Sequence, residues 1–158
     1  MMRVKILGLL AAVLLVAACE TTPPPNTAAT SATQPGRAAP GTAADFQQNV
    51  GDRVFFDYDS FQLTAEARQI LTRQSAWLKQ YGTYRVTVEG HADERGTREY
   101  NLALGERRAA SVRAFLVSQG IPANRVATIS YGKERPAEAG STEQAYARNR
   151  RGVSVLSN

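Results

Sequence analysis

Apolar and polar positions alternate with two different periods along residues 45–158, and the two periods predict two kinds of element. Between residues 84 and 89 they alternate one by one, as in a half-buried strand. In residues 64–81 apolar positions recur at three- and four-residue steps, which predicts an amphipathic helix capped by Thr64 and ended by Gly82. The apolar face of that helix consists of Ala67, Ile70, Leu71, Trp77, Leu78 and Tyr81.

A second helical repeat covers residues 97–119, ends at Gly120 and is followed by Pro122, which cannot continue a helix. Its expected inward positions are Leu102, Ala109, Val112 and Leu116. Further strands are predicted at residues 54–56, 126–131 and 153–156, and a short helix at residues 143–147. Strands that alternate with helices predict an α/β fold: a two-layer sandwich of the βαβαβ type, with helices packed on one face of a mixed sheet.

Residues 1–18 have the pattern of a secretory signal peptide. Arg3 and Lys5 precede an apolar run over residues 6–18 that is too short to cross a bilayer, and Cys19, the only cysteine of the chain, follows it. We therefore expect cleavage before Cys19 and lipidation of this residue with an S-diacylglycerol group and an N-palmitoyl chain. A lone cysteine is more often a small buried side chain, but the residues after Cys19 supply no core to bury it in.

Residues 19–44 are expected to form a flexible tether behind the lipidated cysteine. The stretch 20–44 holds five of the seven prolines and no Leu, Ile, Val, Phe or Trp, so it cannot bury enough apolar surface to order itself. Residues 45–158 have the length of one ordinary domain. No disulfide can form within this domain, because it contains no cysteine.

Charge and side-chain chemistry exclude several classes of function. The formal net charge of +5 falls to about +3 once Arg3 and Lys5 leave with the signal peptide, and basic residues alternate with acidic ones, so nucleic acid is not an expected partner. His91 is the only histidine, which leaves no metal site of the usual ligands. No nucleophile motif is present either. We therefore expect neither an enzyme nor a bound cofactor or metal.

Candidate binding chemistry lies in the charge-rich residues 88–112. Asp93 lies in the loop after a strand, while Asn101, Leu104 and Arg108 recur at three- and four-residue steps on one face of the second helix. If the loop folds back over that helix, a carboxylate and a guanidinium could hold the two ends of a small zwitterion. The alternative is a loop-to-helix ion pair, which contributes little when exposed.

Residues 54–60, 88–112, 129–136 and 149–151 resemble, in the same order, four segments of the OmpA-like peptidoglycan-binding family. The resemblance covers residues 45–158 and implies the fold described above. It also implies that Asp93 and Arg108 bind the two ends of the side-chain amino acid centre of meso-diaminopimelate, which belongs to the stem peptide of peptidoglycan. Asn101 would then donate to a ligand carboxyl group, or only fix the loop, and Leu104 would line the same site.

The remaining site residues are expected on the same grounds. Phe56 and Asp57 would line the pocket wall, Asp57 through its backbone, although Phe56 is equally well a core residue. His91 would belong to the site and order its loop by hydrogen bonding. Arg150 and the adjacent Arg151 would have a rim or structural role. Gly152 stands where relatives carry a strand former, which leaves the start of the last strand open.

The resemblance to lipidated members of the family implies a lipid-anchored protein of the cell outer membrane, with its domain in the periplasm. Glu20, which follows Cys19 in place of an aspartate, favours that destination. Such a protein would tether the membrane to the wall and act with the Tol system in envelope integrity and in outer-membrane constriction at cell division. Its protein partners would be the β-propeller TolB and TolA.

Two alternatives stay open at this point. The domain could act as a protein-interaction module that docks TolB, or the chain could be a lipidated paralogue without a propeller partner. A flagellar stator would need an uncleaved membrane helix at the N-terminus, and the sequence before Cys19 speaks against one.

Overall fold

The computed structural model describes residues 38–158. The predicted signal peptide, Cys19 and residues 20–37 of the predicted tether lie outside the described residues. None of the helices in residues 38–158 is long and apolar enough to cross a membrane.

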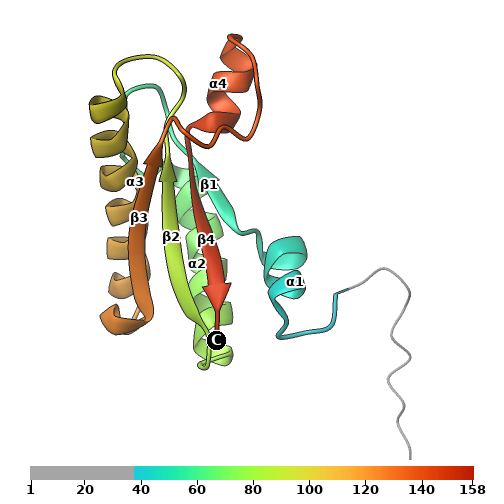
Figure 1. The fold of residues 1–158 in the computed structure, drawn as a ribbon. Coiled ribbons are helices and arrows are strands. Elements are labelled where there is room, and N and C mark those ends of the chain that lie inside the picture. Colours follow the sequence, from blue (N-terminus) through green and yellow to red (C-terminus); the bar gives the residue numbers. More distant parts are fainter. Residues whose placement is uncertain (1–37) are drawn as a thin grey trace, which may run out of the picture. The chain divides into compact units, whose positions relative to one another are not determined.

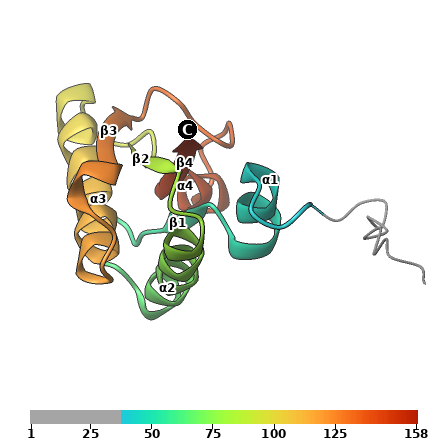
Figure 2. The same cartoon turned by 90° about the horizontal axis from the view of Figure 1, so that it is seen from below.

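Four strands form one mixed sheet: β1 (Arg53–Phe55), β2 (Arg85–His91), β3 (Val126–Gly132) and β4 (Arg151–Ser157), in the order β1-β4-β2-β3. Strand β2 runs parallel to β3, and β4 runs antiparallel to β1 and β2. The two long helices, α2 (Ala65–Gln80) and α3 (Arg98–Ser118), cover one face of this sheet (Figures 1 and 2). The predicted two-layer α/β fold with a mixed sheet is confirmed.

The short elements lie before, between and after these layers. They are α1 (Ala43–Asp45), the helical turn η1 (Phe46–Val50), the 3₁₀ turn η2 (Ala123–Arg125) and α4 (Glu143–Asn149), which precedes β4. The predicted short helix at residues 143–147 is therefore present and two residues longer. Strand β4 begins at Arg151 and contains Gly152, whose missing side chain leaves room for Val112 and Phe56 at 3.3 and 3.4 Å from the position of a Cβ atom.

The start of α2 is capped by Thr64 as expected, and the start of α3 is capped in the same way by Thr97. The hydroxyl of Thr64 accepts a hydrogen bond from the backbone N–H of Ala67 at 3.1 Å, and that of Thr97 accepts one from Tyr100 at 3.2 Å. The inward face of α3 differs from the prediction, because Leu102 is only half-buried. The buried positions of α3 are Asn101, Leu104, Gly105, Arg108, Ala109, Val112 and Leu116. The N-terminal half of α3 thus presents polar groups inward as well as apolar ones.

The core fills the space between the helices and the inner face of the sheet, and it reaches toward the N-terminus of the described chain. Phe46 packs edge-on against Trp77, with ring centroids 5.0 Å apart, and the indole N–H of Trp77 donates to Asp45 at 2.8 Å. The hydroxyl of Tyr84 donates to the carbonyl of Gly41 at 3.0 Å. Contacts with the domain therefore begin four residues before the predicted boundary at residue 45, which itself stays a prediction.

Two glycines bring α3 against the end of β2. A Cβ atom on Gly90 would lie 1.8 Å from the carbonyl oxygen of Gly105, and one on Gly105 would lie 2.3 Å from the hydroxyl of Ser130. Only residues without side chains permit this approach. Because β2 ends at His91, the approach places the start of α3 beside the loop that carries Asp93.

Candidate functional site

Arg108 projects from α3 and is completely buried, with 0% of its surface exposed. Its Nε donates to the carbonyl of Ser60 at 2.8 Å, Nη1 to that of His91 at 2.8 Å and Nη2 to that of Asp57 at 3.1 Å. These bonds use three of the five guanidinium N–H groups and leave two for another acceptor.

The charge of Arg108 has no carboxylate beside it. None of the ion pairs found among the described residues includes Arg108. Burial lowers the pKa of Arg108 to about 10, against an opposing effect of the more distant Asp93. At neutral pH the site therefore holds a buried cation whose counterion is missing from its immediate surroundings.

Asp93 follows β2 and is 5% exposed. Its carboxylate accepts hydrogen bonds from Nη2 of Arg95 at 2.6 Å and from Nε and the backbone N–H of Arg95 at 3.1 Å, and it lies 3.4 Å from Nη1 of Arg150. Burial acts to raise the pKa of Asp93, but the hydrogen bonds from Arg95 outweigh burial and keep that pKa below its usual value. Asp93 is thus ionised and firmly oriented at neutral pH.

A cavity of about 150 Å³ lies between these two groups. Four of the residues expected to meet there, Asp93, Asn101, Leu104 and Arg108, line it together. It is also lined by Tyr58, Asp59, Arg95, Gly96 and Tyr100. The loop folds back over α3 as expected, yet Arg108 bonds backbone carbonyls and is not the exposed ion-pair partner of Asp93 that the alternative required. The cavity therefore has an anionic and a cationic group on its walls.

The sequence interpretation missed five residues of this cavity, and Arg95 is the one among them that contacts Asp93. Its guanidinium lies between the rings of Tyr58 and Tyr146, 4.2 and 4.3 Å from their centroids, and it reaches Glu143 at 3.4 Å. A donor two residues after an aspartate is a common loop pattern and could have indicated the bond to Asp93. The stacking on two aromatic rings could not have been anticipated, because Tyr146 belongs to α4.

Asn101 contributes to the site through its side chain, whereas His91 contributes through its backbone. The Nδ2 group of Asn101 donates to the carbonyl of Arg95 at 2.8 Å, so the expected loop-fixing role is present. The hydrogen bond by which His91 holds the site does not come from its ring, since neither ring nitrogen has a hydrogen-bond partner of ordinary geometry within residues 38–158. Burial, and after it the charge of Arg151, lowers the pKa of His91 to about 4, so the ring is neutral and forms no ion pair with Glu89 at 3.6 Å. His91 contributes to the site through its carbonyl, which holds Arg108.

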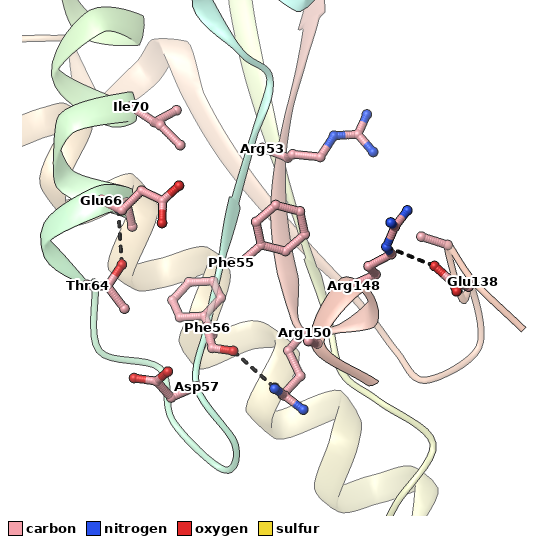
Figure 3. Close-up of a pocket in the computed structure, with 13 residues that line it drawn as sticks. Arg53, Phe55, Phe56, Asp57, Thr64, Glu66, Ile70, Glu138, Arg148 and Arg150 are labelled. Carbon is pink, nitrogen blue, oxygen red and sulfur yellow. Dashed lines mark hydrogen bonds and ion pairs between the residues drawn. The ribbon is translucent and has the colours of Figure 1, made fainter. Parts of the chain in front are cut away.

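Phe56, Asp57 and Arg150 line a second and larger cavity, which Figure 3 shows from the side of β1. Phe56 is 3% exposed and belongs to the core, while its carbonyl accepts from Nε of Arg150 at 3.1 Å. The backbone carbonyl of Asp57 accepts a hydrogen bond from Arg108, and its expected contact with a ligand stays a prediction. Arg150 connects the two cavities, since Nη1 also lies 2.8 Å from Glu143 and 3.4 Å from Asp93. Arg151 bonds the carbonyl of Arg135 at 3.1 Å, which is a structural contact.

No group of three or more His, Cys, Asp or Glu side chains within residues 38–158 is arranged to hold a metal ion.

The OmpA family matches residues 55–150, and the chain belongs to this family. Among curated proteins, it is 54% identical over 132 residues to the peptidoglycan-associated lipoprotein of Brucella melitensis. This match covers 84% of this chain and 79% of the Brucella protein. It is 60% identical over 121 residues to the protein of the same name from Agrobacterium fabrum. This match covers 77% of this chain and 68% of the Agrobacterium protein.

Solved structures agree with this assignment. The crystal structure of the peptidoglycan-associated lipoprotein from Burkholderia pseudomallei matches with a TM-score of 0.67 and 34% identity, over 70% of this chain and 96% of that one. The C-terminal domain of Helicobacter pylori MotB matches with a TM-score of 0.63 at 19% identity, which supports the fold alone. The predicted resemblance is confirmed, and membership of this family confirms that the protein is not an enzyme.

Proposed function

We propose that this protein is an outer-membrane lipoprotein that binds peptidoglycan noncovalently through the meso-diaminopimelate of the stem peptide. The observation that carries the proposal is Arg108, a fully buried cation without a carboxylate partner at a cavity that also contains the ionised Asp93. Burying an unpaired charge is costly, so the site gains most from a ligand that brings its own carboxylate. An amino acid centre brings a carboxylate and an ammonium group together.

The carboxylate of the ligand accepts the two N–H groups that Arg108 has left, while the three carbonyls keep the guanidinium in place. The ammonium group lies toward Asp93, with Asp59 as a second carboxylate on the cavity wall. Charge-assisted hydrogen bonds contribute about 1.5–3 kcal/mol each, so a few of them produce a reversible grip. The repetitive wall then raises the effective strength of binding.

Arg95 competes with the incoming ammonium group, because it already donates to both carboxylate oxygens of Asp93. Its side chain is 33% exposed and rests on aromatic rings, so it can move aside or share the carboxylate without disturbing the core. This competition favours a moderate affinity, which suits a tether that must release and rebind.

Sedimentation with purified diaminopimelate-type peptidoglycan tests the proposal. The full chain in mild detergent should pellet with the wall, and Asp93→Asn should abolish this while it preserves the shape of the side chain. Glu99→Gln is the matched control, since it removes an exposed carboxylate from the first turn of α3 outside the cavity. A wild-type chain that stays in the supernatant, or an Asp93→Asn variant that pellets as well as Glu99→Gln, would refute the proposal.

The wider role follows from the anchor and the partners expected from the sequence. Lipidation at Cys19 would hold the chain on the outer membrane, and the domain would tether this membrane to the wall from the periplasm. The same proposal includes a role in the Tol system. TolB and TolA would be the partners, and constriction of the outer membrane at division would be the outcome. Lipid labelling of wild-type cells, compared with cells that carry Cys19→Ser, tests the anchor.

A further inference from the structure

The larger cavity is a groove of about 780 Å³ beside β1. Figure 3 shows β1 between α2, which carries Glu66 and Ile70, and the segment that carries Glu138 and Arg148. A volume of this order is in the range of ligand pockets, roughly 300–1,000 Å³. The groove is distinct from the small cavity to which the proposed function assigns the ligand.

The floor of the groove is a free strand edge. Strand β1 lies at the edge of the sheet, and Val54 is paired with Gly152 of β4. On either side of Val54, the carbonyl of Asp52 accepts from Ser154 at 2.7 Å and the N–H of Phe56 donates to Arg150 at 2.9 Å. Backbone groups of an antiparallel strand alternate in direction, so those of residues 53 and 55 point away from β4 and into the groove. An extended peptide can pair with such an edge.

The groove and the Asp93 and Arg108 cavity are separate, but residues of their walls contact each other. Arg150 lines the groove and lies 3.4 Å from Asp93, while Asp57 lines the groove and accepts from Arg108 at 3.1 Å. A chain whose charged centre occupies the smaller cavity therefore has to cross only these wall residues to reach the edge of β1.

The walls carry both signs of charge, small apolar groups and the larger side chains of Phe55 and Ile70. Arg53 and Arg148 are 47% and 62% exposed and are paired with Asp52 and Glu138 at 2.8 and 3.0 Å. The pair of Arg148 and Glu138 is exposed on both sides and therefore weak, whereas Arg53 donates to both oxygens of the buried Asp52 and keeps its remaining N–H groups toward solvent. Ala67 and Ala147 leave room for small side chains between the walls. This lining suits a short peptide of small residues with free carboxylates, and it is not the continuous apolar surface on which a hydrophobic helix would dock.

From these features we infer that the groove binds the peptide backbone that carries the diaminopimelate, as an added strand along the free edge of β1. This inference rests on the proposed function and extends it. The recognised unit is then an extended stem peptide and not the amino acid centre alone. Arg53 and Arg148 receive its carboxylates, and the backbone of residues 53 and 55 pairs with its amides.

Calorimetry with two ligands tests the inference on the full chain in mild detergent. Free meso-diaminopimelic acid reaches only the smaller cavity, whereas a soluble stem tetrapeptide that contains it also reaches the groove. Two added backbone hydrogen bonds should make the tetrapeptide bind roughly tenfold more tightly than the amino acid. Ala147→Phe should fill the groove and remove this preference without changing the affinity for the amino acid. Unchanged binding of the amino acid also shows that the variant is folded.

Gln144→Phe is the matched control, because it adds the same ring to an exposed position of α4 outside the groove. It should retain the wild-type preference. The inference is overturned if the wild-type chain binds both ligands equally well, or if Ala147→Phe keeps the preference for the tetrapeptide. In either case, binding of the amino acid would still support the proposed function. A wild-type chain that bound neither ligand would overturn both.

Discussion

Replacement of Arg108 by methionine tests whether the buried guanidinium holds the site together. The change keeps an unbranched stem and removes the three hydrogen bonds to the carbonyls of Ser60, His91 and Asp57. Hydrogen bonds from a charged group contribute about 1.5–3 kcal/mol each. Burial lowers the pKa of Arg108 to about 10, so the buried cation is itself unfavourable and its removal offsets part of the lost hydrogen bonding. The net destabilisation should therefore be about 3 kcal/mol.

Urea unfolding followed by circular dichroism measures this change. With a slope of about 2 kcal/mol per molar urea, the midpoint should fall by about 1.5 M. Arg107→Met is the matched control: Arg107 is exposed and stacks on Phe61 at 5.6 Å, so its loss should change stability by less than about 0.5 kcal/mol. If both variants unfold at the same urea concentration as the wild type, the carbonyl contacts of Arg108 do not support the loop. Binding by Arg108→Met should be measured without urea, where the variant is folded.

Three further predictions concern the packing, the pH dependence and the ligand. Gly105→Ala should cost about 1–3 kcal/mol, because its Cβ would lie 2.3 Å from Ser130, whereas Gly82→Ala, with no atom within 4 Å, should be nearly neutral in thermal unfolding. Between pH 6.5 and about 4 the unfolded chain binds a proton at His91 that the folded chain excludes, so stability should fall by up to about 3 kcal/mol as the pH is lowered through this window. His91→Phe should flatten that dependence in urea titrations at pH 7 and 4.5, and an unchanged slope would assign it to other groups. Peptidoglycan with amidated diaminopimelate should pellet less of the chain, since the amide no longer offers Arg108 a negative charge; equal pelleting on both walls would contradict this role of Arg108.

The sequence interpretation anticipated the members of the small cavity better than their contacts. Asp93, Asn101, Leu104 and Arg108 were expected together because their spacing places three of them on one helical face beside the loop. Arg108 is fully buried, and its bonds reach carbonyls 48 and 51 residues away as well as the nearer His91. No periodicity carries such information.

His91 shows the opposite case, in which a residue of suitable chemistry was given an unsuitable role. Successive side chains of a strand point to opposite faces, so position 91 on β2 faces away from Gly90 and from the helix that carries Arg108. The carbonyl of His91, rather than its ring, reaches the site. Side-chain chemistry alone favoured the ring, because a backbone contact leaves no trace in residue type.

By itself, the sequence determined the features that depend on neighbours a few residues apart. The caps at Thr64 and Thr97, the alternation of residues 84–89 and the end of the second helix all involve bonds or packing within about four positions. Tertiary structure alone decided which distant groups meet. The stacking of Arg95 on Tyr146, the position of Arg150 between the two cavities and the free edge of β1 depend on the strand order β1-β4-β2-β3 and on the close approach of Gly90 to Gly105. Short-range hydrogen bonding is encoded in local residue type, whereas these contacts arise only when the whole core is packed.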